Sequence, residues 1–208
     1  MWLQTWMFIV ANQNSIGEVN TMWKWAAIIL FFQLDILIIL ALYDHGKYEL
    51  IPIQEVVERK ASQETRDWKA LSLIPEEYRY HTYAFCLKYS VPVPIFCALV
   101  QAESEWNPST VGANSDSIDI GLCQLNSKNK TYFEQQFKGY TVYNPIHNLE
   151  IGAWFLGKMY KEHKSWTLAL AAYNAGSHAV KTSQIPRSTK KYVLKIWTWI
   201  QNNLKNVS

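Results

Sequence analysis

A nearly uninterrupted run of apolar residues from Trp25 to Tyr43 constrains this chain more than any other feature of its sequence. As an α-helix the run would rise about 28 Å, which is close to the hydrocarbon thickness of a bilayer. It is interrupted by Gln33 and Asp35, and a carboxylate at mid-span is costly to insert. Asp35 is therefore either a tolerated polar residue or a contact with a partner membrane protein. We expect residues 25–43 to form one transmembrane helix.

The flanks of this run bear on its processing and orientation. No cleavage site of small residues follows it, and no cysteine precedes Cys86, so we expect an uncleaved anchor without lipoprotein processing. Lys24 precedes the run, whereas Lys47, Arg59 and Lys60 follow it within twenty residues, so the positive-inside rule does not support export of the part of the chain after the run. Residues 1–24 would then form an N-terminal extension.

The composition excludes several classes of protein. A formal net charge of +3 is too small to indicate nucleic acid as a partner. Three cysteines allow at most one disulfide, which excludes a disulfide scaffold and a four-cysteine zinc site. His147, His163 and His178 lack the paired spacing of a zinc site, so we expect no metal. The 10 Trp and 12 Tyr residues suit either a membrane interface or a sugar ligand.

Downstream of the anchor, the sequence predicts a mostly helical chain. Residues 44–75 carry mixed charge and are interpreted as a partly helical stalk or linker. Apolar residues then recur at steps of three and four, and no alternating stretch competes in length. We expect helices over 76–89, from Pro94 to before Pro108, from Asn148 to His163, over 166–173 with Ser165 as N-cap, and from an N-cap at Ser188 or Thr189 to Ile200. The fold class is therefore mostly α with at most a small β or loop element.

One acid stands out at the end of the most apolar of these helices. Glu103 lies four residues after Leu99 and seven after Phe96, so its side chain projects from the apolar face. Glu105, in contrast, shares the polar face with Gln101. A carboxyl group in apolar surroundings has a raised pKa and can donate a proton near neutrality, as glycoside cleavage requires. The alternative is that Glu103 is a helix-end acid that faces solvent.

Four short motifs occur in order around this acid. They are the pair Glu103 and Ser104, the sequence GLCQ at 121–124, an Asn-Pro pair and helix start at 144–153, and the sequence AYNAG at 172–176. This set resembles the lytic transglycosylase domain of the lysozyme-like superfamily. The loop before and after Gly121 is most similar to the branch associated with secretion, conjugation and pilus machines. Cys123 departs from the family, which usually has Met there, and this predicts an altered fit rather than lost activity.

The resemblance implies a lysozyme-like helical domain over residues 76–208 and assigns roles to its residues. Glu103 would be the catalytic acid and base. The supporting or substrate-binding residues would be Ser104, which orients Glu103 or the sugar, Gln124, which lines the cleft, Tyr173 and Asn174, which lie over the scissile sugar, and Tyr192, which lines the cleft from the last helix. No cofactor is implied.

The implied reaction is cleavage of the β-1,4 bond between N-acetylmuramic acid and N-acetylglucosamine in peptidoglycan, with formation of 1,6-anhydro ends. A competing interpretation is a retaining muramidase, because the loop around Asp119 is also similar to the active-site loop of animal-type lysozymes. The two carboxyl groups of Glu103 and Asp119 would then lie about 5–5.5 Å apart. Otherwise Asp119 binds backbone amides and fixes the turn. A non-catalytic scaffold that binds the wall is a further alternative.

The expected partners are peptidoglycan glycan strands, the membrane through residues 25–43, and a secretion or envelope-spanning machine. The chain would sit in the bacterial inner membrane with a single span and hold its catalytic domain in the periplasm or outer wall space.

Several other residues have two interpretations. Trp106, Trp154 and Tyr132 are either core residues or platforms for sugar rings. Cys86 and Cys97 either form a disulfide across a helical hairpin or remain buried thiols. The last set is basic and forms either a solvated face or a contact with anionic wall polymer or lipid headgroups: Lys181, Arg187, Lys190, Lys191 and Lys195.

Overall fold

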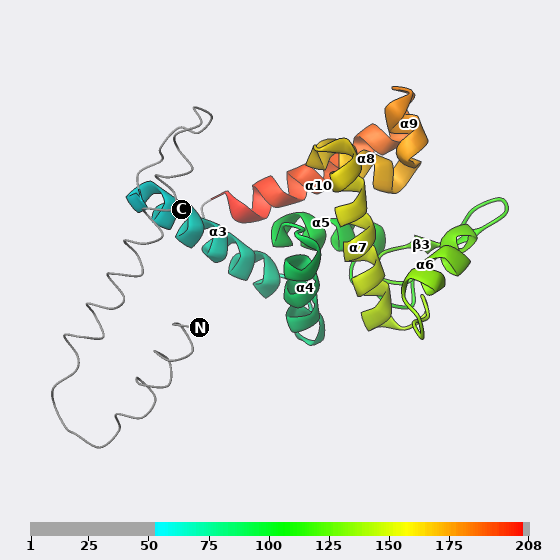
Figure 1. Ribbon diagram of the computed structural model, residues 1–208, viewed down its shortest axis with the longest axis horizontal. Helices are drawn as coiled ribbons and strands as arrows, with labels where there is room; N and C mark the ends of the chain where they lie inside the picture. The colour runs from blue at the N-terminus through cyan, green and yellow to red at the C-terminus, as the bar shows by residue number, and fades with distance from the viewer. Residues whose placement is uncertain (1–52, 206–208) are drawn as a thin grey trace, which may run out of the picture. The chain divides into compact units, whose positions relative to one another are not determined.

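Helices make up most of residues 53–205, the part of the chain that the computed structural model describes (Figure 1). The elements are α3 (Ile53–Ser72), α4 (Glu76–Tyr89), α5 (Val93–Ser104), β1 (Val111–Ala113), β2 (Ile118–Ile120), β3 (Leu125–Asn126), the 3-10 helix η1 (Ser127–Asn129), α6 (Lys130–Gln136), α7 (Pro145–His163), α8 (Trp166–Ala175), α9 (Ser177–Lys181) and α10 (Arg187–Leu204). The predicted mostly α class with a small β element is confirmed. The predicted extension and the anchor over 25–43 lie outside the described residues, and none of the described helices is long and apolar enough to cross a bilayer.

Helix α5 forms the centre of the core. Pro94 in its first turn favours a helix start, and Phe96, Leu99 and Val100 are fully buried. Helices α3, α4 and α10 all pack against it. The helix ends at Ser104, where Glu105 takes up a left-handed conformation with φ of 54°. Because α5 is enclosed along its length, its C-terminal turn is held in place by neighbours on several sides.

The last turn of α3 belongs to the same core. Ala70 and Leu71 are buried, as is Ile74 in the turn that follows, while α3 packs against α4, α5 and α10. The structure therefore gives one unit that begins at Ile53, whereas the boundary at residue 76 drawn from the sequence divides this core. Of the stalk predicted over residues 44–75, the described part forms α3 over Ile53–Ser72, and burial of its last apolar positions offsets the entropy of ordering them.

The predicted start of α8 is confirmed, whereas α7 begins three residues earlier than predicted. Ser165 caps α8 as expected, and its hydroxyl oxygen accepts a hydrogen bond from the Leu168 amide. Helix α7, expected to begin at Asn148, begins at Pro145, because the side chain of Asn144 caps the amides of the first turn. This earlier start places Asn148 one turn inside the helix, where it is fully buried.

The predicted N-cap of the last helix is wrong. Pro186 precedes α10, which begins at Arg187 rather than after Ser188 or Thr189. Proline has a backbone φ that suits a helix start, and Thr189 is buried in the first turn, where its hydroxyl bonds another helix. Val193, Ile196 and Ile200 of α10 are buried in the core.

Strands β1, β2 and β3 form a small antiparallel sheet in that order. The register pairs Gly112 with Asp119 and Asp119 with Asn126. Asp119 thus occupies the middle of the central strand, with polar neighbours on both sides.

Of the aromatic residues with two interpretations, Trp106 is buried, whereas Tyr132 and Trp154 are partly buried against the core. Trp106 is 5% exposed and stacks on Tyr78, which agrees with its assignment to the core. Trp154 contacts Tyr132 and the buried Phe133 in an aromatic cluster that joins α6 to α7.

The three cysteines are buried thiols. Cys86, Cys97 and Cys123 are each free and enclosed by the core. Burial raises the pKa of each thiol well above its ordinary value. The structure therefore contains no disulfide across the α4–α5 hairpin.

Candidate active site

A cleft of about 440 Å³ lies between the small sheet and the helices that follow it. Its lining joins the polar loop residues on one side to aromatic and small residues on the other: Glu103, Asn114, Ser117, Asp119, Gln124, Leu125, Asn126, Lys128, Asn129, Phe133, Phe155, Ala172, Tyr173, Asn174 and Gly176. Polar groups beside aromatic faces are the combination that suits a carbohydrate, which has hydroxyl groups at its edges and apolar ring faces.

Glu103 is the acid at the centre of this cleft. Burial raises the pKa of its carboxyl group to about 7, and the negative charge of Asp119 acts in the same direction. The hydrogen bond from Tyr192 and the charge of Lys195 oppose this rise. Near neutral pH a substantial fraction of Glu103 is therefore protonated, so the group can both donate and accept a proton.

Tyr192 is the direct partner of this acid. Its hydroxyl group donates a hydrogen bond of 2.6 Å to Glu103 Oε1, from α10 across to the end of α5. Burial and the adjacent carboxyl group raise the pKa of Tyr192 well above its ordinary value, so the phenol remains a donor. Tyr192 thereby orients the carboxyl group and stabilises its ionised form.

Replacing Tyr192 by Phe is expected to lower kcat/KM by about tenfold through lost orientation of the acid. Because the lost hydrogen bond favoured the ionised form, the pKa of Glu103 should also rise, and the alkaline limb of the pH profile should move to higher pH. Rates of glycan cleavage measured across a pH series provide the test. A uniform loss of rate with the limb unmoved would show that the hydroxyl group does not act on the acid.

Ser104 lies against the loop rather than in the cleft. Its hydroxyl group donates to the Leu122 carbonyl at 2.8 Å, and its side chain is buried. It therefore ties the end of α5 to the turn over residues 121–124 and positions Glu103 only through that contact.

The turn over residues 121–124 forms the floor of the cleft. Gly121 and Gln124 both have positive φ, of 73° and 47°, and the Gln124 side chain donates to the carbonyls of Thr110 and Gly121. Tyr173 donates to the Cys123 carbonyl at 2.8 Å from α8. Gln124 and Tyr173 thus line the cleft and hold its floor at the same time.

Asn148 fixes this turn from below, a role that the sequence did not reveal. Its side chain accepts from the Cys123 amide at 2.8 Å and donates to the carbonyls of Ile120 and Val142 at 2.9 and 2.8 Å. All three of these side-chain hydrogen bonds are made with backbone groups. A buried amide with three such partners holds the turn in one conformation.

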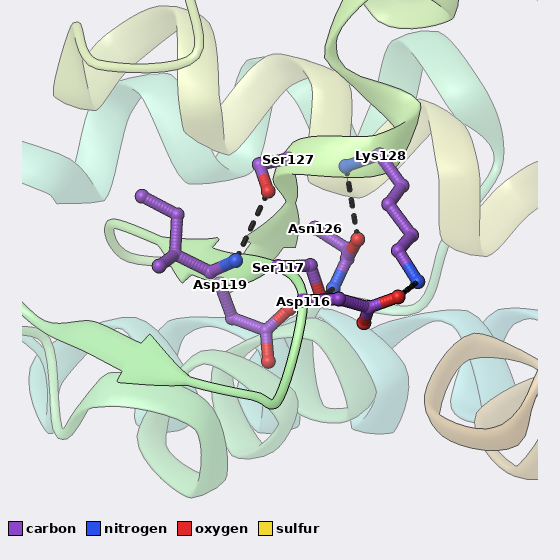
Figure 2. Close-up of polar contacts among 7 residues, drawn as sticks. Asp116, Ser117, Asp119, Asn126, Ser127 and Lys128 are labelled. Atoms are coloured by element: carbon purple, nitrogen blue, oxygen red, sulfur yellow. Dashed lines mark hydrogen bonds and ion pairs between the residues drawn. The ribbon is translucent and has the colours of Figure 1, made fainter.

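Asp119 is held by side-chain amides. Its Oδ2 accepts from Asn114 at 2.9 Å and its Oδ1 from Asn126 at 2.7 Å. The Asn126 side-chain amide also donates to the Ser117 hydroxyl group at 3.1 Å, and Figure 2 shows the three side chains gathered in the hairpin. The sequence-based alternative that Asp119 binds backbone amides is not what the structure shows, because the hairpin brings two asparagine side chains to it.

The remaining predicted site residue is joined to the last helix. Asn174 lines the cleft, and its side-chain oxygen accepts a hydrogen bond of 2.7 Å from the Thr189 hydroxyl group. Thr189 and Tyr192 are three residues apart on α10, so one face of this helix binds both Asn174 and Glu103. The structure therefore brings Glu103, Asp119, Gln124, Tyr173 and Asn174 into one cleft, with Ser104 and Tyr192 bonded directly behind it.

The fold and this cleft define a lysozyme-like helical domain with a single raised-pKa acid in a groove suited to a sugar chain. A family model described as the transglycosylase SLT domain matches residues 84–195, more than half of the chain. The chain belongs to this family, which is one of enzymes, as its motifs predicted.

Two relatives from Salmonella are similar to this chain in sequence. The invasion protein IagB of Salmonella typhimurium and that of Salmonella typhi are 34% identical over 117 residues, which cover 52% of this chain and 68% of theirs.

Solved structures agree in fold. The 70-kDa soluble lytic transglycosylase in complex with bulgecin A has a TM-score of 0.54 at 23% identity, over 61% of this chain and 24% of its own. The Escherichia coli enzyme of that size gives 0.52 at 24% identity, over 63% and 26%. The Slt enzyme of Pseudomonas aeruginosa gives 0.54 at 18% identity, over 64% and 25%. The chain thus spans about a quarter of the length of these enzymes, and the likeness shows the shared fold.

Proposed function

We propose that the protein is a peptidoglycan lytic transglycosylase that uses Glu103 as a general acid and then as a general base. The observation that carries this proposal is the combination of one carboxyl group with a pKa raised to about 7 and a second whose oxygens both accept hydrogen bonds from asparagines. The first can deliver a proton, while two asparagine side chains tie the second to the hairpin, which favours a role in shaping the loop.

The reaction proceeds in two proton transfers. Protonated Glu103 gives its proton to the oxygen between N-acetylmuramic acid and N-acetylglucosamine, and the bond from this oxygen to the muramyl C1 breaks with oxocarbenium character at C1. The Glu103 carboxylate then takes the proton from the muramyl C6 hydroxyl group. The oxygen of the C6 hydroxyl group bonds to C1 and closes the 1,6-anhydro ring, so no water is consumed and no cofactor takes part.

Hydrolysis as a retaining muramidase is the second candidate. It is favoured by the position of Asp119 in the same cleft, near enough for its charge to raise the pKa of Glu103. The two asparagine contacts favour a structural role for Asp119 in the hairpin instead, and the products of the reaction separate the two functions. A scaffold without activity would not need an oriented acid. In this chain Tyr192 bonds Glu103 and holds the carboxyl group in one orientation, which favours proton transfer over a purely binding role.

Mass analysis of the soluble products from purified sacculi separates these functions. Transglycosylation is expected to give anhydromuropeptides, whereas a hydrolase would give products that are heavier by one water. A scaffold would release neither.

Asp119→Asn provides an independent check on the second carboxyl group. We expect it to lower the rate by about tenfold or less and to leave the anhydro product unchanged, because the substitution only weakens the contacts that shape the loop. Loss of a catalytic nucleophile would instead remove turnover almost completely in a protein that still folds. Rates and products from the same digests decide between the two.

We also propose where the enzyme is located in the cell. The apolar run over residues 25–43 would anchor it in the bacterial inner membrane, with the catalytic domain in the periplasm beside an envelope-spanning machine. Resistance of the full chain to alkaline extraction from membranes, and its loss when residues 25–43 are deleted, would test the anchor.

A further inference from the structure

Thr189 is a buried residue of α10 that supports the cleft without lining it. It is 2% exposed, and its hydroxyl group donates a hydrogen bond of 2.7 Å to Asn174 Oδ1 on α8. The cleft lining includes Asn174 but not Thr189. Helix α10 packs against α8, so this bond joins a packed helix to a side chain at the cleft (Figure 1). Thr189 can therefore act on a ligand only through Asn174.

The bond leaves one end of the Asn174 side chain free. An asparagine side chain has an oxygen that accepts hydrogen bonds and an amide nitrogen that donates two. Thr189 holds the oxygen, whereas no residue in the described part of the chain accepts a hydrogen bond from Asn174 Nδ2. Asn174 is exposed where it lines the cleft. The end that remains for a ligand is thus the donor end.

The Thr189 hydroxyl group fixes which end of the amide meets the ligand. The last torsion of an asparagine side chain has a broad energy profile, so an amide without a partner rotates and presents its oxygen or its nitrogen. A bond at the oxygen removes this freedom before the ligand arrives. An amide that is ordered in advance loses less entropy on binding, and this increases affinity.

We propose, resting on the function proposed above, that Thr189 is a positioning residue that holds the Asn174 amide so that Nδ2 donates to an acceptor oxygen of the sugar chain. Glycan strands carry such oxygens on their hydroxyl groups, ring ethers and N-acetyl carbonyls. The contact supports the bound sugar both before and during the reaction, so its loss should raise KM and leave kcat nearly unchanged.

The test compares Thr189→Val with the matched control Thr82→Val in the full chain. Thr82 is fully buried on α4, lies outside the cleft lining, and its hydroxyl group has no hydrogen-bond partner among residues 53–205. Both substitutions are also made in the Glu103→Gln protein, and sedimentation with purified sacculi gives its dissociation constant. Values of kcat and KM are measured on soluble glycan strands with Glu103 intact.

We expect Thr189→Val to weaken binding by about fivefold and to raise KM by a similar factor, with kcat within about twofold of wild type. Thr82→Val should bind as the parent protein does, and Thr189→Ser, which restores the hydroxyl group, should recover most of the affinity. A merely structural effect would reduce the folded fraction and hence kcat, while KM and the dissociation constant stayed the same. That result would overturn the proposal.

Variants of Asn174 test whether Thr189 acts through this amide. Asn174→Ala should weaken binding at least as much as Thr189→Val, and the two together should weaken it no further than Asn174→Ala alone. Additive losses would contradict the proposal. Asn174→Asp keeps an acceptor for Thr189 but offers the ligand no donor, so it should bind as weakly as Asn174→Ala. Wild-type affinity in Asn174→Asp would mean that an oxygen meets the sugar, against the proposal.

Sedimentation requires no cleavage, so it separates this inference from the proposed activity. Binding of the parent protein and of Thr189→Val with equal affinity would overturn the inference alone. Failure of the parent protein to bind sacculi would overturn the proposed function and this inference with it.

Discussion

Glu103→Gln is expected to lower the rate of glycan-strand cleavage by roughly three orders of magnitude while leaving the protein folded. The amide keeps the size and one hydrogen-bond acceptor of the side chain, so Tyr192 retains its partner. The amide can neither deliver a proton to the glycosidic oxygen nor remove one from the C6 hydroxyl group. The release of soluble muropeptides from purified sacculi measures the effect.

Glu105→Gln is the matched control for this prediction. Glu105 lies two residues further along the chain, is exposed, and lines no part of the cleft. It should keep wild-type activity. If the two variants lost activity equally, the assignment of the acid to Glu103 would be wrong.

Glu103→Gln also has an expected effect on stability, and this effect depends on pH. Because burial raises the pKa of Glu103 from 4.5 to about 7, the folded protein binds this proton more tightly than the unfolded chain. The stabilisation that the proton provides is complete below the unfolded pKa and is lost as the pH rises through the folded one. Glu103→Gln should therefore raise Tm relative to wild type at about pH 8, and this difference should shrink toward about pH 4.

Asn148→Leu is expected to have the largest effect on stability. The leucine leaves the Cys123 amide and the Ile120 and Val142 carbonyls buried without their present partner. At about 1–3 kcal/mol for each unsatisfied group, with partial relaxation, the free energy of unfolding should fall by roughly 3–5 kcal/mol. For a domain of this size Tm should fall by roughly 10 °C, which thermal unfolding followed by circular dichroism would measure.

Asn202→Leu serves as the control, because Asn202 is exposed on the last turns of α10. Its Tm should change by no more than about 2 °C. A similarly small change for Asn148→Leu would show that the turn over residues 121–124 keeps its conformation without this amide. Activity should also fall in Asn148→Leu, since that turn carries Gln124 and the carbonyl that Tyr173 bonds.

The sequence was sufficient to find the acid because the relevant signal is local. Glu103 follows Leu99 at one helical turn, and a helix that is apolar nearly all round must be buried, so its last turn carries the acid into the protein. The helical class and the α8 cap followed from equally short-range patterns. These predictions needed no knowledge of which elements meet.

The parts that could not be predicted depend on contacts between distant segments. Asn114 and Asn126 meet at Asp119 only because the hairpin folds back on itself. Asn148 resembled the first residue of a helix, and nothing in its neighbourhood indicates that its amide reaches Cys123. Serine and threonine favour N-cap positions, so the sequence predicts a cap at Ser188 or Thr189, whereas the Thr189 hydroxyl group bonds Asn174 instead.

Cys123 illustrates how close packing beneath the cleft limits the choice of side chain. A Cβ atom added to Gly152 of α7 would lie 2.4 Å from the Cys123 sulfur, so the helix backbone approaches this residue closely. The side chain at 123 is fully buried in this space. The departure from the methionine usual in the family therefore lies in the core, at a residue that does not line the cleft.

Proton donation by Glu103 requires that this acid stays protonated close to neutral pH in the free enzyme. A carbon-13 NMR titration of the glutamate side-chain carboxyl groups, assigned by comparison with Glu103→Gln, measures this directly. We expect a resonance with its midpoint near pH 7 that disappears in the variant. A midpoint near the ordinary value of 4.5 would contradict it, because the acid would then be ionised before any substrate arrived.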